Sequence, residues 1–406
     1  MNSTFPIGYF DRPNARLEML ARVFLVISLF VLPISTAATN IFMGLTLIAW
    51  LAAGGYKARL TQLRGHWFAY AVVMLFLIIC FGATYSSGSQ NDILYQLHKY
   101  GKLLFILPAI TLLQDEKWQE RALLGFGAAM LITLAISLIT VIWPLSFVTA
   151  TANGPTDNHY VFKDHIAQNL MMSFFAMILA VKAKFTPDLK RKIIFYCLAA
   201  LAIIDILFFV AGRTGFLSLA LNAIVFIFFL PTAKQKIAGL LALVVVVALA
   251  FQFSTNFKGR IALAVNEFEM QEQKELTSVG QRIEFLKKSA QLIEEKPLFG
   301  FGTGSYAREF CRVADSAEWC AAGSFHPHNQ FLAFMVQLGA VGLLAYLAII
   351  AAAIKSATNQ TRLLQICSVG LVATLIADSI THAPLFLVTE SQFFILLFSA
   401  LLTKKD

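Results

Sequence analysis

The sequence predicts an all-α polytopic membrane protein with about twelve transmembrane helices. Hydrophobic residues make up 58% of the 406 residues, charged residues make up only 14%, and the mean hydropathy is +0.71. A soluble chain of this length needs roughly a quarter charged residues to cover its surface. The apolar runs are continuous and do not alternate with polar residues, so they indicate helices and not the strands of a membrane barrel.

Apolar runs of about 15 to 25 residues define the predicted spans, some of them short enough to be tilted or re-entrant. We find no internal repeat, low-complexity tract or separate soluble domain, so one membrane domain is expected over 1–406. The predicted spans are 20–36, 39–54, 66–84, 95–113, 122–146, 165–182, 193–211, 214–231, 237–254, 329–354, 363–380 and 385–402.

Basic residues are concentrated in alternate connections, which indicates a topology and also accounts for the net charge of +9. The opposite connections hold few cations, namely Lys163 in 147–164 and Arg213 in 212–213, and none at 37–38, 86–94 or 381–384. Basic loops stay on the cytoplasmic side, so both termini are expected there and 255–328 is expected outside, in the periplasm of a bacterial inner membrane. The basic connections carry Lys57, Arg59, Arg64, Lys117, Arg121, Lys182, Lys184, Lys190, Arg191, Lys192, Lys234, Lys236, Lys355, Arg362, Lys404 and Lys405.

The outer segment 255–328 is the only long stretch too polar to lie in a membrane. An amphipathic helix is predicted from about 277 to 295, with an apolar face that is made of Ile283, Leu286, Ala290 and Ile293. Pro297 ends this helix. The following Gly300, Gly302 and Gly304 favour a tight turn over a phosphate cradle.

Ionisable groups gather at the outer ends of the spans, where they are functional candidates. Lys99 begins the fourth span, and Asp378 and Glu390 lie near the outer ends of the last two. Asp205 lies in the middle of the seventh span, where a hydrogen-bonded structural carboxyl is an equally good interpretation.

A periplasmic enzyme has no ATP or nucleotide sugar and needs a donor that is already activated. For a membrane-embedded enzyme this favours a lipid-linked pyrophosphate. Arginine suits such a leaving group, because its planar fork binds phosphate oxygens bidentately and stays charged. Arg213 and Arg282 are the best-placed candidates, although Arg213 alone is equally typical of a snorkelling side chain and Arg282 alone is more typical of a solvated charge.

His328 is the candidate general base. It is predicted at the start of the tenth span, where the positive end of the helix dipole lowers the pKa of an imidazole and keeps it neutral. Asn329 and His326 are supporting candidates. His326 and His328 could also ligate a metal with Glu318 or Cys320, but the spacing matches no standard zinc site, so neither metal nor cofactor is expected.

Two of the five cysteines, Cys311 and Cys320, lie in the outer segment, where an oxidising compartment allows a disulfide. Two free thiols remain the alternative. Cys80, Cys197 and Cys367 lie in spans and are expected to pack as small hydrophobes.

The residues of the outer segment resemble the O-antigen ligase/polymerase superfamily. The matching pattern is Ser278-x-Gly280-x-Arg282, Lys296-Pro297-Leu298-Phe299-Gly300-x-Gly302-x-Gly304-x-Tyr306, His328-Asn329-x-x-Leu332 and Gly339-x-x-Gly342, with Arg213-Thr214-Gly215 after an apolar span. The resemblance covers about 210–345. It implies a GT-C-like, metal-independent, inverting glycosyltransferase in which Arg213 and Arg282 hold pyrophosphate and His328 activates the acceptor hydroxyl.

Within that superfamily, the size and the single large outer loop favour a ligase. Such an enzyme moves O-polysaccharide from undecaprenyl pyrophosphate to lipid A–core, and its partners would be these two substrates and membrane lipids, with no nucleic acid. An O-antigen polymerase is the nearest alternative. A protein O-oligosaccharyltransferase is the third alternative, because those members usually carry a longer periplasmic C-terminal region. A transporter or flippase would need charges at the bilayer midplane and paired repeats.

The topology predicts the outcome of a reporter fusion. A reporter that is active only in the cytoplasm, fused at about position 270, should give no signal, because this segment is expected outside the membrane. A strong signal would contradict the topology, and fusion within the basic connection at 57–64 provides the positive control.

Overall fold

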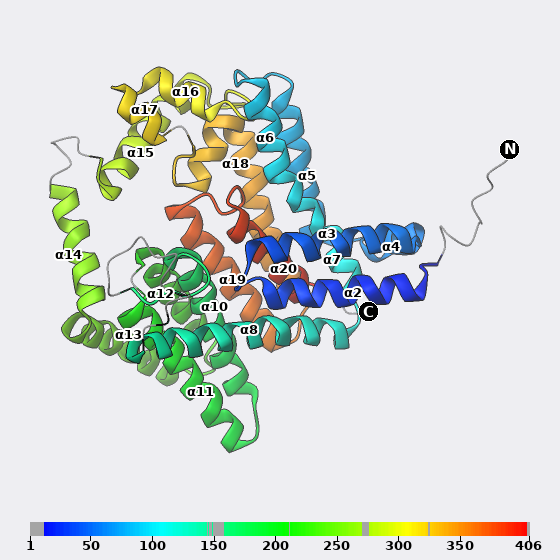
Figure 1. Cartoon of the computed structure of the whole chain (residues 1–406), viewed down its shortest axis with the longest axis vertical. Helices are drawn as coiled ribbons and strands as arrows, with labels where there is room; N and C mark the ends of the chain where they lie inside the picture. The colour runs from blue at the N-terminus through cyan, green and yellow to red at the C-terminus, as the bar shows by residue number, and fades with distance from the viewer. Residues whose placement is uncertain are drawn as a thin grey trace.

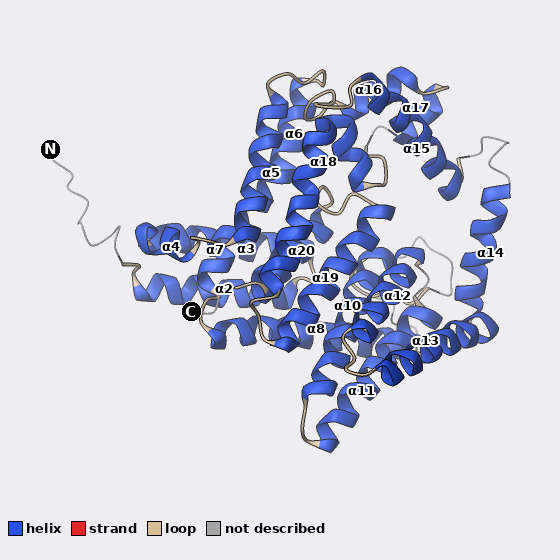
Figure 2. Cartoon of the chain, turned by 180° about the vertical axis from the view of Figure 1, so that it is seen from behind, coloured by secondary structure: helices blue, strands red, loops and turns tan. Residues whose placement is uncertain are grey.

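The protein is all-helical over the part that is described in this computed structural model, with no strand among those residues (Figures 1 and 2). The described residues are 12–143, 145, 148, 158–210, 212–269, 276–323 and 325–403. The end of the fifth predicted span and the start of the connection after it lie partly outside this set. The prediction of an all-α polytopic membrane protein is confirmed.

Each predicted span coincides with a helix or a group of consecutive helices, although their lengths differ. Among the described residues, seven helices are individually long and apolar enough to cross a membrane, and α4 with α5, bent by 107°, makes an eighth candidate. These are fewer than the twelve predicted spans, because helices such as Arg213–Phe228 and Val388–Leu401 are shorter. The bounds are α2 (Ala15–Val31), α3 (Thr36–Ala53), α4 (Tyr56–Gln62), α5 (Trp67–Ala83), α6 (Gln90–Gly101), η1 (Lys102–Phe105), α7 (Ile106–Leu112), α8 (Glu116–Ile142), α10 (His165–Phe185), α11 (Leu189–Ile204), η2 (Asp205–Phe209), α12 (Arg213–Phe228), α13 (Ala233–Phe253), α14 (Thr255–Glu269), α15 (Ser278–Glu295), α16 (Tyr306–Val313), α17 (Ala317–Gly323), α18 (Gln330–Ala357), α19 (Arg362–Thr381) and α20 (Val388–Leu401).

Two of the predicted spans are interrupted. The fourth is divided into α6, η1 and α7, and Pro108 stands in α7, where it cannot donate the backbone hydrogen bond of a continuous helix. The seventh ends in the π-helical turn η2, which begins at Asp205. The buried Asp205 carboxylate accepts a hydrogen bond of 2.6 Å from Ser137, so this acid has a structural partner.

Helices α10 and α19 form the centre of the bundle. In α10, 78% of the apolar stretch that could cross a membrane is buried inside the protein. The corresponding share is 72% in α19 and only 6% in α13. A helix that is apolar all round and buried belongs to a core, and one that is apolar but exposed faces lipid in a membrane protein. Helix α12 packs against both of these central helices, α10 and α19.

The polar segment forms a second, smaller core beside the ends of α18, α5 and α6 (Figure 1). Its buried members include Phe285 and Leu292 of α15 and Phe310 of α16. The predicted apolar face of α15 is partly wrong: Ile293 packs against this core, but Leu286 is 54% exposed and Ala290 is also exposed. The aromatic ring of Phe285 takes the buried position because it packs edge-on against Phe310.

The glycine-rich turn joins this second core to the bundle. Gly302 donates its backbone N–H to Gln337 at 2.7 Å, Gly304 donates to the Gln337 side chain at 2.7 Å, and Gly300 donates to Lys296 at 3.1 Å. These N–H groups are therefore occupied by protein acceptors, and the expectation of a turn instead of a phosphate cradle agrees with this geometry. Gly339, at φ +62, kinks α18 where the turn packs against it.

Gly302 provides a stability test with a matched control. A Cβ at Gly302 (φ +94) would lie 2.3 Å from the Ser86 Cα, whereas Gly65 (φ +73) has open space around it. Left-handed backbone costs a residue other than glycine about 1–2 kcal/mol at either site, and only Gly302→Ala adds a backbone clash. Thermal unfolding in detergent should show a clearly larger drop in Tm for Gly302→Ala than for Gly65→Ala. Equal drops would contradict the tight docking of the turn.

Candidate functional site

Arg213 is held at the first residue of α12 by close helix packing. A Cβ at Gly215 would lie 2.4 Å from the Asn169 Cβ of α10, so a glycine is needed for this approach. The Asn169 amide in turn donates a hydrogen bond of 2.7 Å to the Val210 carbonyl, just before the turn into α12. The Gly212-Arg213-Thr214-Gly215 pattern therefore fixes the position of the Arg213 backbone at the start of α12.

Three elements meet at this guanidinium. Arg213 pairs with Glu267 of α14 at 3.2 Å and donates to the Ser278 hydroxyl of α15 at 2.9 Å. The same Glu267 oxygen accepts the backbone N–H of Val279 at 3.2 Å, in the first turn of α15. One carboxylate oxygen thus receives an arginine and a helix N-terminus, which is the environment of an anion site.

Arg282 lies one helical turn beyond Ser278 on α15, within the electrostatic reach of Arg213. Burial and the positive charge of Arg213 both lower the pKa of the Arg282 guanidinium, and Glu267 opposes that shift. Two guanidiniums that repel each other are stable together when an anion compensates them, and Glu267 does so here. The carboxylate of Glu267 therefore lies where the two cationic side chains favour an anion.

His328 is positioned differently from the sequence-based expectation. Helix α18 begins at Gln330 with Asn329 as its N-cap, so His328 precedes the helix and does not start it. Its φ of +49 is uncommon for a residue other than glycine. Its backbone N–H donates to the His326 Nδ1 at 3.0 Å, which closes the turn around Pro327. This turn, and not the helix, aims the imidazole.

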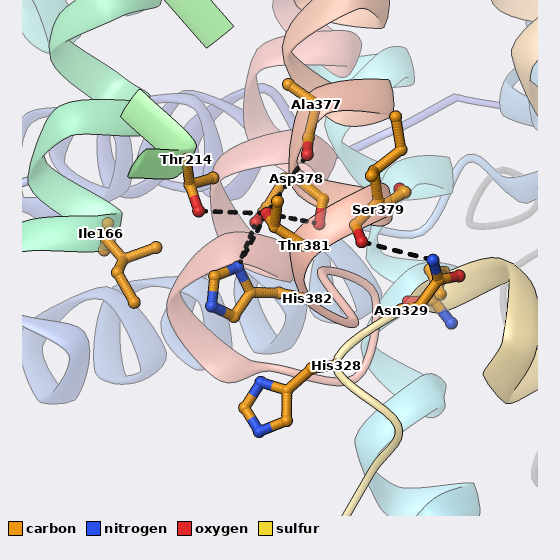
Figure 3. A network of polar contacts seen from close by, with 12 residues as sticks. Ile166, Thr214, His328, Asn329, Ala377, Asp378, Ser379, Thr381 and His382 are labelled. Carbon is orange, nitrogen blue, oxygen red and sulfur yellow. Dashed lines mark hydrogen bonds and ion pairs between the residues drawn. The ribbon is translucent and has the colours of Figure 1, made fainter. Parts of the chain in front are cut away.

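The His328 ring is packed among three aromatic rings. It stacks on Phe285 of α15 with centroids 5.8 Å apart, and its centroid lies 4.3 Å from that of His326 and 5.7 Å from that of His382. Figure 3 shows the contacts that run from Thr214 through Thr381 to His382, with His328 beside them. These contacts connect α12, which carries Arg213, to the histidine cluster.

The electrostatics of the cluster favour uncharged imidazoles. Burial first, and then the neighbouring His382 and Arg282, together lower the pKa of His328 to about 4. Burial also lowers the pKa of His326 to about 3 and that of His382 to about 4. The low pKa of His328 was expected, but the helix dipole is the wrong cause. Burial and nearby positive charge produce the shift.

The other supporting candidates come from the ends of four helices. Asn329 caps α18 and donates to the Ile380 carbonyl at 3.3 Å, so it ties α18 to α19. Asp378, fully buried in α19, lies 3.3 Å from the His382 Nδ1. The Lys99 ammonium lies over the Phe386 ring, which also contacts His326. Glu390 is buried in the first turn of α20.

Two residues of the site were missed by the sequence reasoning. His382 follows Asp378 by one turn at the outer end of α19, so the clustering of polar groups at span ends could have identified it. Glu267 sits on a half-exposed amphipathic helix, and no sequence signal distinguishes it from the neighbouring Glu269.

The alternative interpretation, a metal site at His326 and His328, has one candidate ligand fewer in the structure. A disulfide joins Cys311 to Cys320, the predicted pair, and connects α16 to α17. The Cys320 sulfur is therefore not available as a thiolate. Among the described residues, no group of three or more His, Cys, Asp or Glu side chains is placed to hold a metal ion.

The comparisons with known proteins identify the part of the chain that holds this site. Residues 197–347 match the family model described as O-antigen ligase. The match includes Arg213, Arg282 and His328, and it confirms the family resemblance over that part of the chain. No curated protein matches the sequence. The family match supports a glycosyltransferase-like membrane enzyme of the O-antigen ligase/polymerase type, which acts on lipid-linked O-antigen.

Glu267 predicts an effect on anion binding. Glu267→Gln removes the carboxylate that competes for Arg213, so inorganic pyrophosphate should bind to the purified protein roughly tenfold more tightly, the order of one charge-assisted contact. Glu269→Gln, on the same helix and exposed, makes the same charge change and should leave the affinity unchanged. Weaker binding by Glu267→Gln would contradict the anion-site interpretation. Calorimetric titration measures both.

Proposed function

We propose that the protein is an O-antigen ligase of the bacterial inner membrane, which transfers O-polysaccharide en bloc from undecaprenyl pyrophosphate to a sugar hydroxyl of lipid A–core. The observation that carries this proposal is the meeting of two arginines with the half-buried His328 imidazole, whose pKa is lowered, at one end of the bundle. The family match over the same residues supports the class of donor. In this proposal, 255–328 faces the periplasm and both termini are cytoplasmic.

The arginines bind the donor. Pyrophosphate carries more negative charge than one carboxylate and offers oxygens to both guanidinium groups, so it displaces Glu267 from Arg213. The backbone N–H of Val279, which now donates to Glu267, becomes available to the same anion. As the glycosidic bond to phosphate breaks, the leaving pyrophosphate gains charge, and the arginines stabilise that charge.

His328 acts on the acceptor. Its neutral imidazole takes the proton from the acceptor hydroxyl while the hydroxyl oxygen bonds to the anomeric carbon. The bond from that carbon to the pyrophosphate oxygen breaks on the opposite face, so the configuration inverts and lipid pyrophosphate leaves. The stack on Phe285 holds the ring in place, and His326 fixes the backbone turn behind it. Chemistry that uses a metal is not needed for any of these steps.

A reconstitution experiment tests the proposal and separates it from the polymerase alternative. Purified protein in liposomes receives undecaprenyl-pyrophosphate-linked glycan and either lipid A–core or a second lipid-linked glycan as acceptor. A ligase produces glycan on lipid A–core and leaves the second glycan unextended. Extension of the lipid-linked glycan alone would instead establish a polymerase, and no transfer to either acceptor would contradict a glycosyltransferase of this type.

His328→Ala should lower the rate of transfer by about 10²–10⁴-fold, the usual loss for a general base. Donor binding rests on the arginines and should persist, so the donor accumulates unused. His326→Ala should cause a smaller loss, because His326 supports the turn and does not take the proton. Single-turnover kinetics and donor titration measure the two effects. Normal transfer by His328→Ala would exclude the base role.

The pH dependence follows from the direction of the His328 shift. A pKa lowered from the ordinary 6.5 to about 4 leaves the imidazole unprotonated throughout mildly acidic conditions. Transfer, measured as kcat/KM, should therefore change little between pH 7 and 5.5 and should fall only as the pH approaches the lowered pKa. A loss centred near pH 6.5 would show that the active-site histidine titrates like an exposed one.

A further inference from the structure

A cavity of about 510 Å³ lies at the end of the bundle opposite to the arginine site, and its charged lining is entirely cationic. Lys184 stands in the last turn of α10, Lys236 in the first turns of α13, and Arg362 at the first residue of α19. No carboxylate is among the lining residues in the part of the chain that the structure describes. Three cations that share one cavity without an acid favour an anionic ligand.

Each cation is held over an aromatic ring. The Lys184 ammonium lies 5.8 Å from the Phe226 centroid, the Lys236 ammonium 5.2 Å from that of Phe228, and the Arg362 guanidinium 4.6 Å from that of Phe229. Such contacts hold a charge in position while its remaining hydrogen-bond donors stay available. Lys184 uses one donor on the Phe229 carbonyl at 2.9 Å, and the other two remain for a ligand.

An apolar cavity of about 270 Å³ adjoins the cationic one. It lies between α10, α11 and α12 and is lined by Met177, Tyr196, Leu219 and Phe226 among others. The Phe226 ring lines this cavity and contacts Lys184, which lines the cationic one, so the two cavities meet at this pair of side chains. A free phosphate would use only the cationic part. A molecule with an anionic head and an apolar tail matches both parts.

We propose that these adjoining cavities bind an anionic glycerophospholipid of the membrane, with its phosphate among Lys184, Lys236 and Arg362 and an acyl chain in the apolar cavity. The site is separate from the donor site. Helices α12 and α19 run between the two ends, and their 16 and 20 residues span about 24–30 Å. The bound lipid ties the ends of α10, α12 and α19 together, and Arg213 and His382 lie at the other ends of α12 and α19.

The test measures lipid binding to the purified full-length protein by native mass spectrometry. Wild type should bind phosphatidylglycerol about tenfold or more tightly than phosphatidylcholine, because the cations attract a net negative head. The triple variant Lys184→Gln, Lys236→Gln and Arg362→Gln should lose this preference. The control triple Lys117→Gln, Lys190→Gln and Arg191→Gln removes the same charge from exposed positions and should keep it.

A second variant separates a lipid from free phosphate. Ala223 lines the apolar cavity on α12, and Ala223→Phe fills that cavity while all three cations remain. It should weaken phosphatidylglycerol binding and leave inorganic phosphate binding unchanged. The double variant Lys236→Gln with Arg362→Gln serves if the triple variant does not fold. The proposal is overturned if removal of the cations leaves the preference intact, or if inorganic phosphate binds as tightly as phosphatidylglycerol and displaces it.

Discussion

The repulsion between Arg213 and Arg282 is the constraint on which the site depends. Two guanidiniums in a partly buried setting destabilise each other unless an anion compensates them, and Glu267 does this in the free protein. The compensation draws α12, α14 and α15 to one point. In the proposed function, a pyrophosphate satisfies this site better than a single carboxylate. The same arrangement would then stabilise the free protein and prepare it for the proposed donor.

A rigid support connects this point to the histidine. The segment that carries Arg282 runs from α15 to His328. The glycine-rich turn within this segment is hydrogen-bonded to Gln337, near the kink of α18. Phe285 of α15 stacks directly on His328. The distance between the arginines and His328 is thus set by a packed core, and in the proposed function this core keeps the donor and the acceptor aligned.

Sequence reasoning predicted the helical membrane architecture, the limits of α15 and the disulfide pair, since these depend on local hydropathy, proline and cysteine. It also predicted that Arg213 and Arg282 lie near each other, whereas their roles stay a prediction. It could not predict contacts that depend on how distant helices pack. Leu286 and Phe285 are both apolar, and only the position of Phe310 decides which of them is buried. Glu267 and Glu269 are equivalent in sequence, and His382 reaches His328 only because α19 lies beside the turn before α18.

A structure of the protein with a lipid-linked pyrophosphate bound, determined by cryo-electron microscopy, tests the central claim most directly. The account predicts phosphate oxygens within hydrogen-bond distance of both Arg213 and Arg282, with Glu267 displaced from Arg213 and the anomeric carbon of the sugar facing the His328 ring. Pyrophosphate bound elsewhere, with the contact between Arg213 and Glu267 intact, would contradict it.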